Sequence, residues 1–386
     1  MKTCVLDLFK HPYVCIGINV GAKFEKKECN GISHLLEHVI MACEGMVDLA
    51  KDNFVDAITT KEWTYYIIIS YQEDMSQEIS CFLNCIMKNE IKLQTINIEK
   101  NIIISEQMDR SVFARYYQLI NRQMHLNTPY ELATGGMIES ISKLTYKEIV
   151  DFYNQNYKNE ENIVVYCNDN SVLQIVKNKM DTYSLHDKKR EIETHEYLPE
   201  DFFAIRKDNR ATLVLAKNLF SKDREFKEKI YILNDAIWGR NGLLIEEIKK
   251  KFHVYSLKGI NDIYEDHVLI GFGVQIDNMH VKAYLEFVCG YINKIIKDRN
   301  MIIDIIDKRR HVYLIEKSCI NEDIFSRIRW ENEIRSLQES DRNKIFITQD
   351  EYMRIEETYR ISDWTRIAFS DQDTIELIRR LGDEHL

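Results

Sequence analysis

One short stretch, residues 30–41, constrains this chain more than any other, because it sets three chemically active side chains on an apolar run. His34, Glu37 and His38 stand at positions i, i+3 and i+4, so they share one face of a helix. Two imidazoles one turn apart can hold a zinc ion (Zn²⁺), and a carboxylate beside them can take a proton from the metal-bound water. We expect Asn30 or Ser33 to cap this helix.

The order of the motif, H-x-x-E-H, is the one that inverted zincins carry. By itself the motif is equally consistent with an ordinary amphipathic helix whose histidines are solvated. A catalytic zinc usually has three protein ligands and an open position for water. A third ligand elsewhere in the sequence is therefore needed to favour the metal site.

Glu106 is the candidate third ligand, and Glu99 lies seven residues before it, two turns back on one predicted helix over residues 96–125. With this pair the chain resembles the M16 metallopeptidases, the family of pitrilysin, insulysin and the mitochondrial processing peptidase. The resemblance implies that His34, His38 and Glu106 bind zinc, that Glu37 is the general base and that Glu99 supports the site. The alternative is that the two glutamates are exposed acids on a long helix, and the joint pattern favours the metal site.

Further residues extend the resemblance over about residues 13–170. A predicted strand ends in Gly-Ala-x-Phe-Glu at Glu25, and residues 144–153 resemble the Leu-Thr helix of the family. The segment that begins at Asp56 and Ala57 resembles the family's Asn-Ala-x-Thr strand, whose edge pairs with substrate, so both residues are implied to bind substrate. Asp56 stands where the family has Asn, and a carboxylate accepts hydrogen bonds but cannot donate them.

The second half of the chain carries a degraded form of another family feature, an Arg and a Tyr that hold the substrate carbonyl. Tyr255 is present, but Lys249 stands at the Arg position. Lysine lacks the planar fork of arginine, so the pair would grip substrate less well. The alternative is that residues 249–251 are a solvated helix end favoured by the helix dipole.

The order of predicted elements is the same in the two halves of the chain, which predicts two related α+β domains of a duplicated fold. We expect a catalytic domain over residues 1–185, a linker over residues 183–200 and a second domain over residues 200–386. Each domain should have a mixed or antiparallel sheet with helices on one face. By the resemblance, the two domains form half of a clamshell chamber. The second half has no H-x-x-E-H, so one metal site per chain is expected.

The composition of the chain further limits the classes of function that it can have. The chain of 386 residues has 62 acidic and 52 basic residues, a net charge of −10. This balance argues against a nucleic-acid surface and mildly favours basic or neutral peptides as substrates. No apolar run approaches the roughly 18 residues of a transmembrane helix, and the start lacks a signal-peptide core. We therefore expect a cytoplasmic protein.

The nine cysteines are scattered without metal-ligand spacing, which is typical of reduced, mostly buried thiols in a cytosolic chain. Cys81 and Cys85 lie one helical turn apart in an apolar setting, which favours core packing over a metal site. Cys29 and Cys43 flank the predicted metal helix and are the thiols that could lie near its chemistry.

Together these features predict a zinc-dependent endopeptidase that cleaves small or unfolded peptides. Short members of the family typically close one chamber from two chains, and the degraded Lys249 and Tyr255 pair favours an unlike, related subunit over a homodimer. The composition and size resemble peptidase subunits found beside bacterial peptide-antibiotic genes, which suggests bacteriocin maturation or immunity. The alternatives are a catalytically idle subunit that binds peptides or scaffolds its partner, and a fortuitous motif in an unrelated binding protein.

Overall fold

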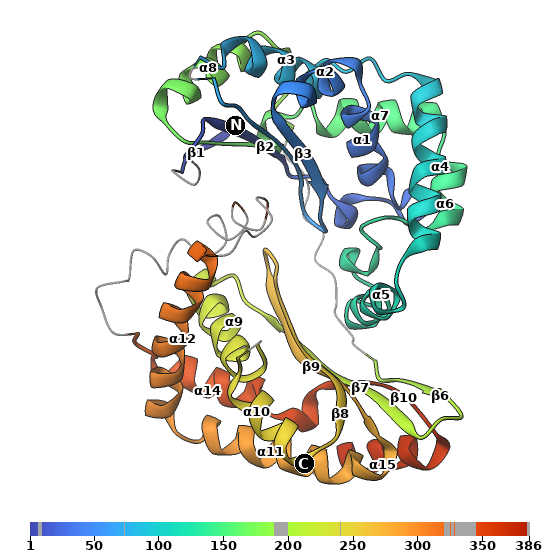
Figure 1. Ribbon diagram of the computed structural model, residues 1–386, viewed down its shortest axis with the longest axis vertical. Helices are drawn as coiled ribbons and strands as arrows, with labels where there is room; N and C mark the ends of the chain where they lie inside the picture. Colours follow the sequence, from blue (N-terminus) through green and yellow to red (C-terminus); the bar gives the residue numbers. More distant parts are fainter. Residues whose placement is uncertain are drawn as a thin grey trace. The chain divides into compact units, whose positions relative to one another are not determined.

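The protein divides into two compact units, Met1–Leu198 and Pro199–Leu386 (Figure 1). The computed structural model describes residues 1–6, 10–72, 74–188, 200–239, 241–319, 325, 328 and 345–383. The boundary between the units lies inside the stretch 183–200. Within the described residues, no helix is long and apolar enough to cross a membrane.

The first unit is built on a five-stranded sheet of order β1-β5-β2-β4-β3. Its strands are β1 (Lys2–Val5), β2 (Tyr13–Ile18), β3 (Phe54–Thr59), β4 (Thr64–Ile69) and β5 (Ile163–Cys167). β1 pairs with β5 in parallel, whereas all other pairings are antiparallel. The central strands are rich in β-branched and aromatic residues, which fit a pleated, buried surface.

Among the described residues of the first unit, seven α-helices lie between these strands in sequence and an eighth, α8, follows β5; most gather on one side of the sheet (Figure 1). They are α1 (Ile32–Met41), α2 (Glu44–Asp52), α3 (Ser76–Met87), α4 (Leu93–Asp109), α5 (Val112–Met124), α6 (Ile138–Lys143), α7 (Tyr146–Asn156) and α8 (Asn170–Met180). Alternate residues of β2, among them Val14, Ile16 and Ile18, pack with buried residues of α1 and α3 in one apolar core. That core fixes α1, the helix that carries the H-x-x-E-H motif, against the sheet.

The second unit repeats this architecture with a sheet of order β6-β10-β7-β9-β8. Its strands are β6 (Phe202–Ile205), β7 (Arg210–Phe220), β8 (Val254–Ile263), β9 (His267–Asp277) and β10 (Thr365–Ser370). Here too the pair at one edge, β6 with β10, is parallel and the rest are antiparallel. Its helices are α9 (Arg224–Trp238), α10 (Leu243–Lys251), α11 (Val281–Ile296), α12 (Arg299–Cys319), α14 (Gln349–Thr358) and α15 (Gln372–Asp383).

The predicted fold class is confirmed, since each unit is an α+β domain with a mixed sheet. Two element predictions were wrong. The run 58–71 is rich in Thr, Tyr and Ile, which predicts one central strand. It is not one strand, because the chain turns between β3 and β4, where the Thr60 hydroxyl accepts the N–H groups of Glu62 and Trp63. The helix expected over 96–125 is broken at Arg110, whose extended ψ of 133° ends α4. The sequence also predicts one long helix over residues 301–337, and most of its part beyond Cys319, where α12 ends, lies outside the described residues.

Candidate metal centre

The helix α1 that carries the motif begins at Gly31, which adopts a left-handed φ of 102°. The cap expected from Asn30 or Ser33 is instead supplied by Glu25. Its buried carboxylate accepts the backbone N–H of Gly31 at 2.7 Å, the N–H of Ser33 at 2.8 Å and the side-chain amide of Asn30 at 2.8 Å. A carboxylate at a helix N-terminus also meets the positive end of the helix dipole. Glu25 thus fixes the first turn of the helix.

A second contact holds the start of α1 from the other side. Gly136, with φ of 75°, approaches Gly31 so closely that a Cβ at position 136 would lie 2.5 Å from the Gly31 Cα. Only glycine at both positions permits this backbone approach and these left-handed angles. The Asn30 amide also donates to the carbonyl of Ala133 at 2.9 Å. The first turn of α1 is therefore tied to residues 133–136.

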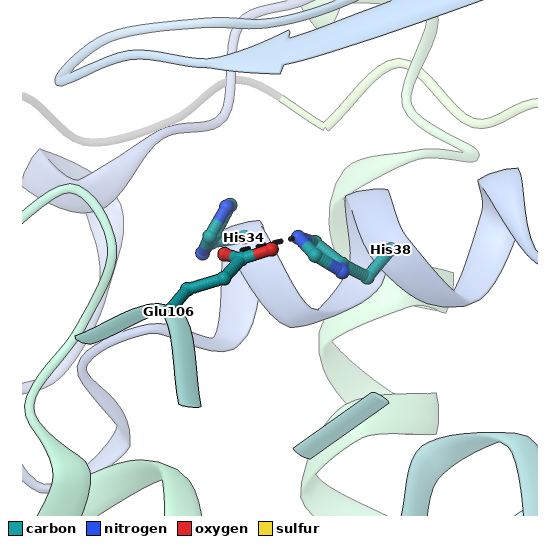
Figure 2. A group of neighbouring side chains, drawn as sticks. All are labelled: His34, His38 and Glu106. Atoms are coloured by element: carbon teal, nitrogen blue, oxygen red, sulfur yellow. Dashed lines mark ion pairs between the residues drawn. The ribbon is translucent and has the colours of Figure 1, made fainter. Parts of the chain in front are cut away.

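The structure brings the three predicted ligands together (Figure 2). His34 and His38 project from one face of α1 with ring centroids 4.7 Å apart, and Glu106 reaches them from α4. One potential ligand atom from each residue lies within 4.8 Å of the other two. The Glu106 carboxylate is 3.8 Å from Nε2 of His38. Across the described residues, this is the one such group of three.

The electrostatics around His34 favour a neutral imidazole, the form that binds metals. Burial, together with the neighbouring His38 and Arg110, lowers the pKa of His34 to about 4. Nδ1 of His34 is buried and has no hydrogen-bond partner among the described residues. A buried nitrogen without a partner is costly unless something else satisfies it. Two neutral imidazoles with a carboxylate are a donor set that suits Zn²⁺, so the residues present fit this metal.

Glu99 lies behind His38 on α4. Its buried carboxylate is 3.1 Å from Nδ1 of His38, the ring nitrogen opposite the one that faces Glu106. A carboxylate in this place fixes the orientation of a metal-binding imidazole and raises its basicity. The same helix thus carries a candidate ligand and the residue that orients another.

Glu37, the candidate base, points to the sheet side of the site, where the Thr59 hydroxyl donates to its carboxylate at 2.5 Å. Burial raises the pKa of Glu37 to about 7, against the opposing effects of that hydrogen bond and of His38, while the charge of Asp56 adds to the rise. The Thr59 hydroxyl lies 3.3 Å from the Thr64 hydroxyl, which donates to the backbone carbonyl of Val20. The sequence pattern predicts no role in the site for Thr59 or Glu25, although both lie within the stretches that carry the family resemblance.

Asp56 and Ala57 lie on β3, the strand at one end of the sheet order. Among the described residues β3 pairs only with β4, so its other edge is unpaired. Phe54 at the start of the strand is exposed, and Thr59 at its end is buried against Glu37. Asp56 is exposed, and its carboxylate accepts the N–H of Ala57 at 2.8 Å. The strand therefore leads from solvent to the candidate base.

Lys249 and Tyr255 belong to the second unit. Lys249 is exposed in the last turn of α10, which is the position of a solvated helix end. Tyr255 is 51% exposed at a register shift in β8, where its hydroxyl donates to Asp277 at 3.1 Å and the guanidinium of Arg210 lies 3.8 Å from the ring centroid. The tyrosine thus has partners within its own sheet.

In the second unit, α9 follows β7 as α1 follows β2, and α9 contacts α12 as α1 contacts α4. Between these two helices lies an ion pair, with Nε of Arg309 2.6 Å from the Asp235 carboxylate. A structural ion pair therefore joins the two helices that correspond to those of the metal-ligand group.

Comparison with known proteins places this geometry in context. The family described as "Peptidase M16 inactive domain" matches residues 143–301. The mitochondrial-processing peptidase subunit beta of Saccharomyces cerevisiae is 24% identical over 163 residues, covering 39% of this chain and 35% of that protein. Cytochrome b-c1 complex subunit 1 of Rattus norvegicus is 23% identical over 161 residues, covering 38% and 33%. The matched part is thus about a third of the length of these relatives.

The fold is similar over nearly the whole chain to a solved structure described as a protease from Helicobacter pylori. The TM-score is 0.78 at 17% identity, covering 95% of this chain and 96% of that one. The comparisons support the M16 family. The M16 domain match begins at residue 143, after His34, Glu37, His38, Glu99 and Glu106. The word "inactive" in its description therefore refers to a stretch that contains none of these five residues.

Proposed function

We propose that this chain is the zinc-binding subunit of an M16-type endopeptidase. The observation that carries the proposal is the group of His34, His38 and Glu106, held by two helices beside a buried glutamate one turn away. The order of the motif and the spacing of the two glutamates on α4 support the same chemistry. A fortuitous motif would not be accompanied by a carboxylate behind His38 or a hydroxyl behind Glu37.

Each residue has a separate task in this proposal. His34, His38 and Glu106 would hold one zinc ion, which when bound supplies a Lewis acid. Glu37 takes the proton from the attacking water and returns it to the leaving amine. Thr59 holds the Glu37 carboxylate in place, and Glu99 holds the His38 ring through the opposite nitrogen.

The substrate would be a small or unfolded peptide that adds as a strand to the unpaired edge of β3. Main-chain hydrogen bonds give such binding affinity without a strict sequence requirement. Because β3 ends at Thr59, a peptide bound along it would extend toward Glu37. A related M16-type subunit would complete the chamber, since Lys249 lacks the guanidinium fork and Tyr255 is bonded to Asp277. A peptide-antibiotic precursor is one substrate of this class.

The test combines metal analysis with a single isosteric substitution. Protein purified without chelator should contain about one zinc per chain, and Glu37→Gln should keep that zinc while lowering cleavage of an unfolded reporter peptide by at least about 100-fold. His34→Ala should lose the zinc. Glu28→Gln, at an exposed position near the start of the same helix, is the matched control and should change neither.

Absence of any transition metal from the untreated protein would refute the proposal, and so would full cleavage by Glu37→Gln. Both measurements should be made on the chain alone and on the chain co-expressed with a related subunit. In the pair, the substitution Lys249→Arg tests whether the second unit limits the rate.

The second candidate is a catalytically idle subunit that binds peptide or scaffolds its partner. It is favoured by the exposed Lys249 at the helix end and by the similarity to a cytochrome b-c1 complex subunit. Glu37→Gln separates the two candidates within the assembled pair. If this chain is an idle subunit, the substitution leaves the cleavage rate of the pair unchanged. If it is the catalytic subunit, the substitution abolishes cleavage.

A further inference from the structure

The pair Gly135 and Gly136 lies against both helices that carry the candidate ligands. Gly136 packs on Gly31, the N-cap residue of α1. The carbonyl of Gly135 accepts the side-chain amide of Gln107, on α4, at 2.8 Å. A Cβ at position 135 would also overlap the terminal nitrogens of Gln107 and Arg110. One dipeptide therefore joins the start of α1 to the end of α4.

The end of α4 depends on this contact, because buried packing holds only the earlier part of the helix. Glu106 is exposed and lies in the last turn, since α4 ends at Asp109. Helix ends fray unless other groups hold them. The side chain of Gln107, next to Glu106, is the one that reaches Gly135. The buried residues of α4 all precede this turn: Ile96, Glu99 and Ile103.

The segment 129–136, which contains the two glycines, is anchored at its other end. Nζ of Lys61, in the turn between β3 and β4, donates to the carbonyl of Tyr130 at 2.7 Å and to the carbonyl of Leu132. The Tyr130 hydroxyl donates to the buried carboxylate of Glu62 in the same turn. The sheet therefore supplies a fixed base from which this segment can hold the two helices.

We propose that the segment 129–136 sets the separation of α1 and α4 and thereby determines how tightly the chain binds zinc. Gln107 and Gly136 are positioning residues: Gln107 acts through Glu106, and Gly136 acts through His34 in the first turn of α1. Metal ligands must be held to within about 0.5 Å, so a small shift of one helix weakens binding. This proposal rests on the proposed function, because it takes His34, His38 and Glu106 as the ligands.

The experiment measures the zinc affinity of full-length variants by competition with a chromophoric chelator, and records the visible absorption of the cobalt-substituted proteins. Gln107→Met removes the amide that donates to Gly135 and keeps the length of the side chain. It should weaken zinc binding about 10-fold, as is usual when a group that orients a ligand is lost, and should alter the cobalt bands. Gln94→Met, at an exposed position of the same helix, is the matched control and should change neither.

Gly136→Ala tests the contact with α1. Its Cβ would lie 2.5 Å from the Gly31 Cα, and its φ is left-handed, so the substitution forces the two backbones apart. It should weaken zinc binding at least as much as Gln107→Met. If Gly136→Ala does not fold, the comparison of Gln107→Met with Gln94→Met decides.

Gly17→Ala is the control for a general loss of stability in the same unit. Its Cβ would lie 2.7 Å from Val164 and 2.8 Å from Tyr65, and neither residue belongs to the core that α1 shares with the sheet. This variant should unfold at a lower urea concentration than the wild type. It should keep the wild-type zinc affinity and cobalt spectrum, because the clash does not reach α1 or α4.

Wild-type zinc affinity and cobalt bands in Gln107→Met would overturn the proposal and leave the proposed function intact. An equal loss of affinity in Gly17→Ala would also overturn it, since zinc binding would then follow stability and not position. A wild-type protein that binds no zinc would overturn both this proposal and the proposed function.

Discussion

Three buried glutamates in the first unit have different tasks because their neighbours differ. Glu25 faces backbone N–H groups, Glu37 faces the hydroxyl of Thr59, and Glu99 faces a ring nitrogen of His38. A buried carboxylate without such donors would be destabilising. The three residues are all glutamates, so the task of each carboxylate follows from the hydrogen-bond donor that it contacts.

The role of Glu25 can be tested by measuring the stability of a variant. Replacing it with Gln places an amide donor against the N–H groups of Gly31 and Ser33, and leaving buried donors unpaired costs roughly 2 kcal/mol. We expect Glu25→Gln to lower the free energy of unfolding in urea by about that amount. Glu28→Gln, on the exposed side of the same segment, should stay within about 0.5 kcal/mol of the wild type. Equal stability of the two variants would show that Glu25 does not hold the helix.

The sequence could indicate His34, Glu37 and His38 because their spacing is local to one helix. Glu25 and Thr59 could not be assigned their roles in this way, since each acts on a residue of another element. The distance of Thr59 from Glu37, 22 residues in sequence, has meaning only after β3 is packed beside α1. Pairings of this kind come from tertiary structure and leave no periodic signal.

The bounds of a helix were predictable where a local sequence signal marks its start or end. The sequence predicts a helix over residues 224–238, and α9 has these bounds; it begins after Asp223, whose carboxylate accepts the N–H of Phe226. The break between α4 and α5 has no proline or glycine to announce it. There the Arg110 side chain donates to Gln118 on α5 and lies against Gly135, contacts that only the folded unit supplies.

The capping box at the start of α7 can be tested by substitution of its threonine. The Thr145 hydroxyl accepts the N–H of Glu148, and the Glu148 carboxylate accepts the N–H of Thr145. Thr145→Ala should lower the free energy of unfolding by about 1 kcal/mol, and Thr145→Ser should restore it because serine keeps the accepting oxygen. Urea denaturation of the three proteins measures the difference. An alanine variant as stable as the serine variant would refute the role of the cap.

The two units have the same architecture, but the corresponding pair of packed helices holds different side chains in each unit. The contact between α1 and α4 holds the candidate metal-ligand group in the first unit, and the corresponding contact between α9 and α12 holds the Asp235 to Arg309 ion pair in the second. In the first unit the two packed helices bring together three possible metal ligands, whereas in the second they bring together two opposite charges.

The ion pair can be tested by a double-mutant cycle. Arg309→Met removes this ion pair from the largely buried Asp235 carboxylate and should lower stability by roughly 2–3 kcal/mol. Adding Asp235→Asn should recover at least half of that loss, since the buried negative charge is removed as well. Zinc content should be the same in all four proteins, because the pair lies in the other unit. Additive losses in the cycle would show that the two side chains are not coupled.

The parallel strand at the edge of each sheet also determines when each unit can finish folding. Lys2 pairs with Val164, and Phe202 pairs with Ile367, so each first strand meets a partner more than 160 residues later. At about 5–20 residues per second of synthesis, a first strand waits roughly 10–30 s for that partner. During this interval its hydrogen-bonding groups are open to other chains. Each unit is therefore most vulnerable to misassembly in the seconds before its last strand leaves the ribosome.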